Sequence, residues 1–252
     1  MRNSTIEYTD IRRRYSKVVS PCPFRKSMQI VAGRARLDGS LIVPSAAAGV
    51  VLFACASDLN RFSRRNRVLA QVLVNARFAT LLLDLLTREE ETIDLETGEY
   101  RADIDLLARR VIAAIDWTTD DEAVSELPVI CFGESMSAPA CLIGAAERPR
   151  RVHAVVLRGG RPDRAGFALA EVQAPTLLIV DGQNGPLIAL NRAAMRYMRA
   201  PVELHTAPMS VNPVLEESGA LDPVSHLALD WCSRQLQATI RDESASARRA
   251  PH

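Results

Sequence analysis

The chain has 252 residues, of which 48% are hydrophobic and 24% charged, and its formal net charge is +1. This length fits one large globular domain, and the near-neutral charge excludes a global field that would recruit nucleic acid or an anionic membrane. The five cysteines are scattered and form no C-x-x-C pair, which argues against a zinc site and for a reducing compartment. The N-terminus is too polar for a signal peptide, and no apolar run approaches the roughly 18 residues of a membrane span. We therefore expect a cytoplasmic protein, and we expect no metal or cofactor.

The two ends of the chain differ in composition from the part between them. Residues 1–26 are locally basic and lack periodicity, which predicts a solvated arm that packs on the domain; a partner-docking or lid segment is the alternative. Residues 241–252 are polar and rich in small side chains, which predicts a disordered tail. Residues 27–240 are therefore expected to form the folded domain.

The predicted elements alternate regularly along that domain. Residues 28–35 and 36–43 predict an antiparallel hairpin. Continuous apolar runs at 49–54, 79–84, 128–132, 154–157 and 175–180 are typical of parallel strands covered on both faces, and a further strand is expected at 202–206. Helical spacing predicts helices at 67–76, 102–117, 138–146 and 187–198, with a last helix from an Asp222 cap to about Leu236. This is an α/β pattern: a mostly parallel, doubly wound sheet with helices on both faces.

A motif at the end of one predicted strand carries the chemistry. The residues Gly133-Glu134-Ser135-Met136-Ser137 follow the strand at 128–132 and precede a helix. G-x-S-x-G at such a turn is the nucleophile elbow, in which small flanking residues allow a strained backbone that exposes the serine. Here Ser137 replaces the last glycine, so an ordinary strand-to-helix turn is the alternative. In an elbow, the N–H of Met136 can donate to an oxyanion.

Longer runs of sequence resemble a known family. They are VVLFA, SRRNRVLAQVL, ATLLLDLLTREEE, FGES, AVVLRGGRPDRAG, VQAPTLLIVDGQ, LNRAA and EESGAL. From about Gly49 to Leu236 the chain is similar to bacterial dienelactone-hydrolase-like α/β-hydrolases. The resemblance implies the α/β-hydrolase fold, with a substrate site beyond the carboxyl ends of the strands.

Several positions depart from what the family implies. Where family members read His-Gly-Ser-Gly-Ser-Ser in the oxyanion loop, this chain reads Cys-Ala-Ser-Asp-Leu-Asn from Cys55, which includes Ser57 and Asp58. An aspartate there opposes a developing oxyanion. The position of the triad acid is Asn184, and that of the triad histidine is most closely matched by Asn212, with a register uncertainty of one residue. Among the four histidines, His205 is the least unsuitable substitute.

The remaining polar positions at the strand ends have two readings each. Arg158 and Arg161 can clamp an anionic or enolised substrate, or they can brace the loop at Asp163. Asp84 can be a cavity acid or the cap of the next turn. Glu134 can carry a proton or be a solvated turn residue, and Cys55 is a weak candidate for a nucleophile because no partner that lowers its pKa is visible.

Serine without a base is a poor nucleophile, so hydrolysis is not the first expectation from these residues. We expect a cofactor-independent, biosynthetic enzyme of non-hydrolytic type, with cyclisation, dehydration, conjugate addition or lyase chemistry on a small molecule. A catalytically inactive binding or scaffold protein and a weak serine esterase or lactonase are the alternatives. The expected partner is a small-molecule substrate, without nucleic acid or membrane, and a homodimer stays open. The expected catalytic residues are Ser135, Asn184, Asn212, Asp58 and Glu134; the expected substrate-binding residues are Cys55, Ser57, Asp84, Met136, Arg158 and Arg161.

Overall fold

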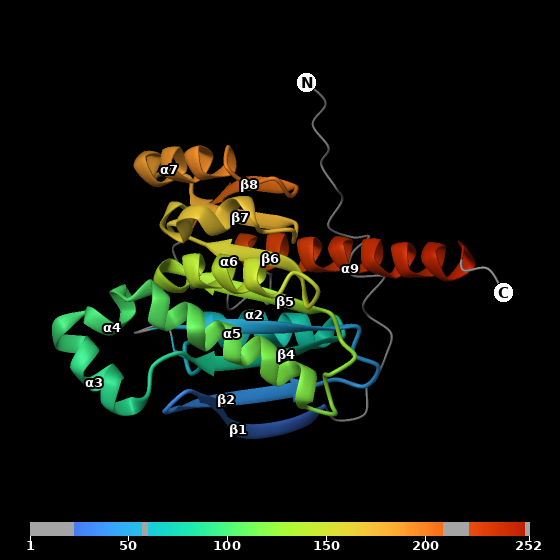
Figure 1. The fold of residues 1–252 in the computed structure, drawn as a ribbon, viewed down its shortest axis with the longest axis horizontal. Coiled ribbons are helices and arrows are strands. Elements are labelled where there is room, and N and C mark those ends of the chain that lie inside the picture. Colours follow the sequence, from blue (N-terminus) through green and yellow to red (C-terminus); the bar gives the residue numbers. More distant parts are fainter. Residues whose placement is uncertain (1–22, 57–59, 209–221, 250–252) are drawn as a thin grey trace.

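The computed structural model describes residues 23–56, 60–208 and 222–249. Within this part of the chain, eight strands form one sheet in the order β1-β2-β4-β3-β5-β6-β7-β8 (Figure 1). The strands are β1 (Phe24–Ala32), β2 (Ala35–Val43), β3 (Gly49–Cys55), β4 (Phe78–Asp84), β5 (Val129–Glu134), β6 (Val152–Arg158), β7 (Thr176–Asp181) and β8 (Val202–Ala207).

The predicted N-terminal hairpin is confirmed. Strands β1 and β2 pair antiparallel from Phe24 opposite Val43 to Ala32 opposite Ala35, and Gly33 takes a φ of +62° in the turn between them. Strand β2 then pairs antiparallel with β4, which joins the hairpin to the edge of the parallel sheet. The first strand begins four residues before the Met28 that the sequence indicates, so the last residues of the expected basic arm belong to the sheet.

The remaining strands run parallel, as the continuous apolar runs predict. Every residue of β3 is buried, and β4, β5, β6 and β7 are buried along most of their length. A strand with helices on both faces has no solvent side, so it selects apolar residues at successive positions rather than at every second one. The fold class expected from the sequence is therefore confirmed.

Helices cover both faces of the sheet. They are α2 (Arg64–Asn75), α3 (Arg88–Thr97), α4 (Glu99–Ala102), α5 (Ile104–Asp120), α6 (Ala138–Glu147), α7 (Gly185–Met195) and α9 (Pro223–Arg249), with 3₁₀ segments η1 (Ser135–Ser137) and η2 (Pro162–Ala170). Helices α5, α6 and α7 lie on one face, and α2 and α9 lie on the other (Figure 1). Each face has its own apolar core, because both surfaces of the sheet must be removed from water.

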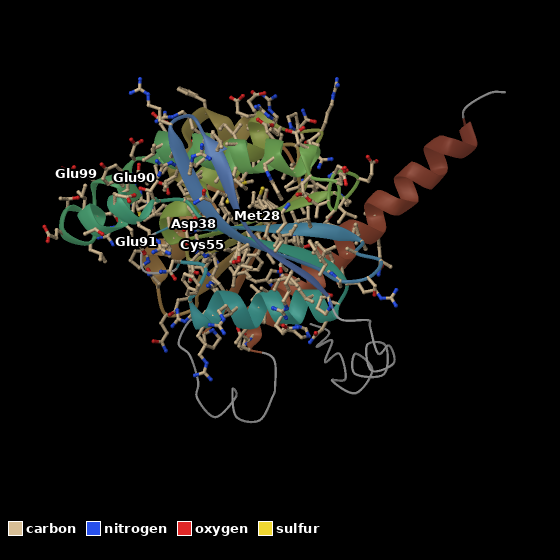
Figure 2. All side chains as sticks on the ribbon, turned by 90° about the horizontal axis from the view of Figure 1, so that it is seen from below. Met28, Asp38, Cys55, Glu90, Glu91 and Glu99 are labelled. Atoms are coloured by element: carbon tan, nitrogen blue, oxygen red, sulfur yellow. The ribbon has the colours of Figure 1, made fainter. Side chains whose placement is uncertain are left out.

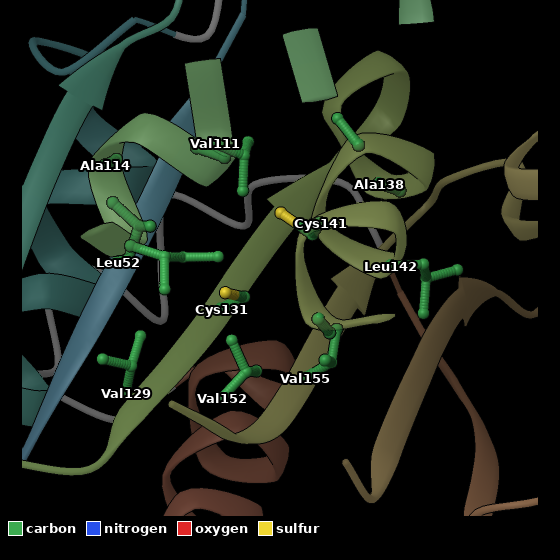
Figure 3. Close-up of a cluster of buried hydrophobic side chains, with 14 of the residues drawn as sticks. Leu52, Val111, Ala114, Val129, Cys131, Ala138, Cys141, Leu142, Val152 and Val155 are labelled. Carbon is green, nitrogen blue, oxygen red and sulfur yellow. The ribbon is translucent and has the colours of Figure 1, made fainter. Parts of the chain in front are cut away.

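Figure 3 shows the core on the α5–α6 face. Leu52 of β3, Val111 of α5 and Leu142 of α6 are fully buried there, together with the thiols of Cys131 and Cys141. The sulfur atoms act as small apolar groups in this layer. Close packing on this face sets the position of α6, and α6 begins at the segment that contains Ser135.

Helices α3, α4 and α9 differ most from the prediction. Helices α3 and α4 have no counterpart among the predicted elements, because α3 carries few apolar residues and α4 is a single short turn without buried residues. Helix α9 begins at the predicted cap, where Asp222 Oδ1 accepts hydrogen bonds from the N–H groups of Val224 and Ser225. Its backbone then continues to Arg249, past Leu236 and through the segment where the sequence predicts a disordered tail. None of the helices within the described residues is long and apolar enough to span a bilayer.

Candidate functional site

The carboxyl ends of the parallel strands bring several predicted site residues to one edge of the sheet. Cys55 ends β3 opposite Asp84 at the end of β4, and Glu134 ends β5 opposite Arg158 at the end of β6. Open α/β sheets bind their ligands beyond this edge. Ser57, Asp58 and Asn212 lie outside the described residues, so their predicted roles stay predictions.

Ser135 has the backbone conformation of a nucleophile elbow. Its φ is +52°, in the left-handed region that residues with a Cβ rarely adopt, and the residue is exposed. It opens η1, directly after β5 and directly before α6. The elbow predicted from the sequence is therefore confirmed, even though the last glycine of the motif is absent.

Ser137 explains why the motif tolerates this change. Its backbone is right-handed helical, with φ −83° and ψ −11°, so the position does not require glycine. Its buried hydroxyl donates to the carbonyl oxygen of Ala54 at 2.7 Å and accepts from the N–H of Glu134 at 2.9 Å. The serine thus adds hydrogen bonds that tie the elbow to the end of β3, which a glycine cannot supply.

Two glycines allow the close packing behind the elbow. A Cβ on Gly133 would lie 2.8 Å from the sulfur of Cys141, and a Cβ on Gly160 would lie 2.1 Å from the Cβ of Ala138. The amide of Asn191 in α7 donates to the carbonyl of Gly160 at 3.1 Å. The segment after β6 can therefore approach the start of α6 only because residue 160 has no side chain.

A buried ion pair lies directly beside Ser135. The Nε of Arg158 donates to Oε1 of Glu134 at 2.7 Å, and its Nη2 contacts the other carboxylate oxygen. The same Nη2 donates to Oδ1 of Asn66 at 3.1 Å, and the amide of Asn66 lies 3.5 Å from the sulfur of Cys55. This cluster joins α2, β3, β5 and β6. The sequence predicted Glu134 as a proton carrier and Arg158 as a substrate clamp, but in the structure the two side chains bond to each other.

Cys55 is fully buried in this cluster. Burial raises the pKa of its thiol, and the nearby carboxylates of Asp84 and Glu134 raise that pKa further. A protonated, inaccessible thiol is a poor nucleophile. The structure thus gives no support to the weak nucleophile hypothesis for this residue.

Asp84 is held by Arg61, which follows the oxyanion-loop position. The N–H of Arg61 donates to Oδ1 of Asp84 at 2.6 Å and its Nη1 donates to Oδ2 at 2.5 Å, while Nη2 lies 3.5 Å from Asp38. Burial raises the pKa of Asp84, and the contacts with Arg61 oppose that shift. Both carboxylate oxygens of Asp84 are therefore engaged within the chain.

Arg61 and Asp84 line a pocket of about 830 Å³ between the β1–β2 turn, the end of β4 and the start of α3, and Ser135, Glu134 and Arg158 are not among its lining residues. Asp38, Arg61 and Asp84 belong to its wall, together with Glu91. Figure 2 shows Glu90, Glu91 and Glu99 around α3 and α4, with Asp38 and Cys55 nearer the centre of the molecule. The pocket has a polar wall at the strand edge where a ligand is expected.

The other predicted site residues have local partners. Arg161 is exposed and forms a two-bond pair with Asp163, with its Nε 2.8 Å from Oδ1 and its Nη2 2.6 Å from Oδ2, which matches the bracing alternative. The Arg161 pair lowers the pKa of Asp163. Asn184 is exposed and caps α7, since its Oδ1 accepts from the N–H of Leu187 at 3.0 Å. Met136 is partly buried and packs against the core.

The histidines in the described part of the chain have local partners or positions away from this edge. His205 lies in β8 and pairs with Glu203 of the same strand at 3.0 Å. His153 is the second residue of β6, at the strand end opposite Arg158, and His226 lies in α9. The segments 57–59 and 209–221, which lie outside the described residues, contain no histidine in their sequence. A serine–histidine pair is therefore not assembled among the described residues.

Two residues of this edge escaped the sequence reasoning. Asn66 lies within the run SRRNRVLAQVL and Arg61 just before it, and their partners are 92 and 23 residues away along the chain. Their residue types alone do not indicate these contacts. The only available signal was their place just after the strand that ends at Cys55, where side chains reach the carboxyl edge of the sheet.

The comparisons with known proteins agree on the fold. A solved dienelactone hydrolase from Anabaena variabilis ATCC 29413 is 46% identical, with a TM-score of 0.78, and the match covers 85% of this chain and 99% of that one. A dienelactone hydrolase-like promiscuous phosphotriesterase from metagenomic libraries is 18% identical with a TM-score of 0.63, over 85% of this chain and 97% of its own. Est1E from Butyrivibrio proteoclasticus is 12% identical with a TM-score of 0.65, over 84% and 99% of the two chains. These two show a shared fold.

Curated relatives carry a different name. Two proteins from strains CDC 1551 and H37Rv of Mycobacterium tuberculosis, provisionally named phosphoribosyl transferases, are each 43% identical over 206 residues. The match covers 82% of this chain but only 45% of their length, so the chain spans less than half of these relatives. No protein-family model matches the chain.

These names correct the main functional expectation. The curated relatives are named as transferases and the 46% identical structure as a hydrolase, so the expectation of cyclisation, dehydration, conjugate addition or lyase chemistry is wrong. The missing triad partners had favoured a non-hydrolytic reaction, whereas the similarity to a hydrolase extends over nearly the full length of that enzyme. Names and neighbours alike indicate an enzyme. By its 46% identity to a solved dienelactone hydrolase, the chain belongs to the dienelactone-hydrolase-like branch of the α/β-hydrolases.

Proposed function

We propose that this chain performs hydrolase-type acyl transfer, in which Ser135 accepts the acyl group of an activated ester and releases it slowly to water. The left-handed backbone at Ser135 is the observation that carries the proposal. Such a conformation costs on the order of 1–3 kcal/mol and persists only where the surroundings impose it, which is typical of functional sites. Here the surroundings are the hydrogen bond from Ser137 to the carbonyl of Ala54 and the close approach of Gly160 to the carbonyl oxygen of Ser135.

The acylation step follows from the position of Ser135. Its Oγ attacks the carbonyl carbon of the ester, a new C–O bond forms, and the bond to the leaving alcohol breaks as the serine proton passes to water. In a nucleophile elbow the N–H of the residue after the serine, here Met136, donates to the developing oxyanion, and its place just before α6 adds the favourable helix dipole. A leaving group that departs as a stable anion needs no proton, so the missing histidine matters least for activated esters.

The deacylation step lacks a general base. Water must be activated by a base, and the positions that the family resemblance assigns to the triad acid and histidine hold Asn184 and Asn212. Enzymes that lose their triad residues keep about 10³–10⁴ of acceleration over water from the oxyanion hole and binding. We therefore expect the acyl-enzyme to accumulate, with its hydrolysis as the slow step.

The transferase name of the mycobacterial relatives describes proteins of which this chain matches 45%. The match to the dienelactone hydrolase covers 85% of the present chain and 99% of that enzyme. This difference supports the assignment of hydrolase-type chemistry to the part that this chain represents, and it places phosphoribosyl transfer outside the present proposal.

Stopped-flow measurement with p-nitrophenyl acetate tests this function. The wild-type chain is expected to release about one p-nitrophenolate per chain in a burst, followed by a much slower phase, as an accumulating acyl-enzyme requires. Ser135→Ala is expected to lose the burst. Ser27→Ala, at an exposed position of β1, is the matched control and keeps it. A wild-type chain without a burst, or a burst of equal size in Ser135→Ala, contradicts the proposal.

A further inference from the structure

We infer that Glu134 and Arg158 are positioning residues, which hold Ser135 in its attacking conformation without touching the substrate. This inference rests on the proposed function of Ser135 and deepens it. It assigns to the pair a task different from the proton transfer and substrate clamping that their residue types first indicate.

The pair is buried at the elbow itself. The side chain of Arg158 is 6% exposed and that of Glu134 is 10% exposed. The guanidinium bonds the carboxylate through two nitrogens and also donates to Asn66 of α2 at 3.1 Å. A bidentate contact fixes the direction of the carboxylate as well as its distance. The side chain of the residue before Ser135 is therefore fixed to β6 and α2.

The backbone of Glu134 is fixed independently. Its N–H donates to the hydroxyl of Ser137, which in turn donates to the carbonyl of Ala54 at the end of β3. Glu134 is thus bound to β6 through its side chain and to β3 through its main chain. Because φ of Ser135 describes rotation just after Glu134, clamping Glu134 on two sides restricts the rotation that would relax the elbow.

The partners of the two side chains favour a positioning role over direct contact with the substrate. Both carboxylate oxygens of Glu134 contact Arg158, and the Glu134 side chain is only 10% exposed, so its carboxylate is directed at Arg158 and largely removed from solvent. Arg158 also lies with its guanidinium carbon 5.4 Å from the ring centroid of Phe132, inside the core layer. A buried ion pair gains little stability over apolar residues of the same size. Its placement beside the nucleophile is what a positioning role requires.

The experiment compares two ion pairs with the same bonding pattern. Arg158→Lys keeps the positive charge but removes the guanidinium group that bonds both carboxylate oxygens of Glu134. The control, Arg148→Lys, makes the same change in the Arg148–Asp116 pair. That pair also bonds through Nε and Nη2, but it joins α5 to the end of α6. In the p-nitrophenyl acetate burst, Arg158→Lys is expected to lower the saturating acylation rate constant at least about tenfold, because small misplacements of reacting groups are costly. The ester concentration at half-saturation stays within about twofold, and Arg148→Lys leaves both constants within about twofold.

A second readout does not depend on activity. Hydrogen exchange of the amides of Met136 and Ser137 is expected to accelerate at least about tenfold in Arg158→Lys and to stay unchanged in Arg148→Lys. If the single variant does not fold, Glu134→Gln with Arg158→Met removes the pair without leaving a buried charge, and the same result is expected. Unchanged acylation and exchange in a folded variant overturn the inference. If the wild-type chain shows no burst but hydrogen exchange at Met136 and Ser137 is faster in Arg158→Lys, the proposed function is overturned and the positioning role of the ion pair is not.

Discussion

At the scale of single residues, Ser135 and its neighbours show what local pattern can and cannot predict. The elbow followed from a serine between small residues after an apolar run, and the φ of +52° confirms it. The contacts that hold it did not follow, because Ser137 bonds Ala54 from 83 residues away and Arg158 bonds Asn66 from 92 residues away. Such partners are brought together by topology, and the residue types carry no sign of them.

The buried thiols give a prediction at the same scale. Burial raises the pKa of Cys131 and Cys232 to about 12, against an ordinary value of 9.0, and it raises the pKa of Cys55 and Cys141 as well. A raised thiol pKa means that the reactive thiolate is lost at any pH below the new value. In a Cys22→Ser background, the native chain at about pH 8 is expected to react only slowly with a disulfide reagent.

Denaturant supplies the control for that measurement. Unfolding removes the burial that raises each pKa, so the same four thiols are expected to react quickly in guanidinium chloride at the same pH. Rapid reaction of Cys55 in the native chain contradicts its buried placement. It would also reopen the hypothesis that this thiol is the nucleophile.

At the scale of elements, the predictions succeeded where a helix or strand buries a clear apolar pattern. The strands β3 to β7 are examples, because burial on both faces selects apolar residues directly, and the start of α9 was predicted separately from the capping pattern at Asp222. Helix α3 was missed since its only buried residue is Asp94. Its signal was the capping box of Thr87 and Glu90, in which each side chain bonds the backbone N–H of the other.

The contact between the segment after β6 and helix α6 yields a prediction for these elements. Gly160→Ala places a Cβ 2.1 Å from that of Ala138, so one of the two elements must move. We expect a loss of on the order of 1–3 kcal/mol in the free energy of unfolding, measured by urea denaturation. The burst rate should fall too, because Ser135 lies beside this contact.

Gly185→Ala is the matched substitution. Gly185 opens α7, and a Cβ there meets no atom within 4 Å. We expect it to leave stability unchanged or to raise it by less than about 1 kcal/mol, since alanine restricts the unfolded chain. If the two variants lose equal free energy of unfolding, the close contact between Gly160 and Ala138 is not the cause of the loss in Gly160→Ala.

At the scale of the whole molecule, a doubly wound sheet places the end of each central strand at one edge, and the sequence predicted that arrangement. It did not predict the use of that edge. Asn184 caps α7, Arg161 braces Asp163, and Glu134 binds Arg158, so the polar groups of these four expected site residues bond to the protein itself. The central claim is accordingly narrow: Ser135 is the acyl acceptor, and its reactivity comes from backbone geometry.

Mass spectrometry of the chain after brief reaction with p-nitrophenyl acetate tests that claim most directly. We predict that about one acetyl group per chain accumulates and that peptide mapping locates it on Ser135, because deacylation lacks a base. Ser135→Ala should remain unmodified at the same peptide. Acetylation that spreads over other residues at the same rate, with none enriched on Ser135, would contradict the account.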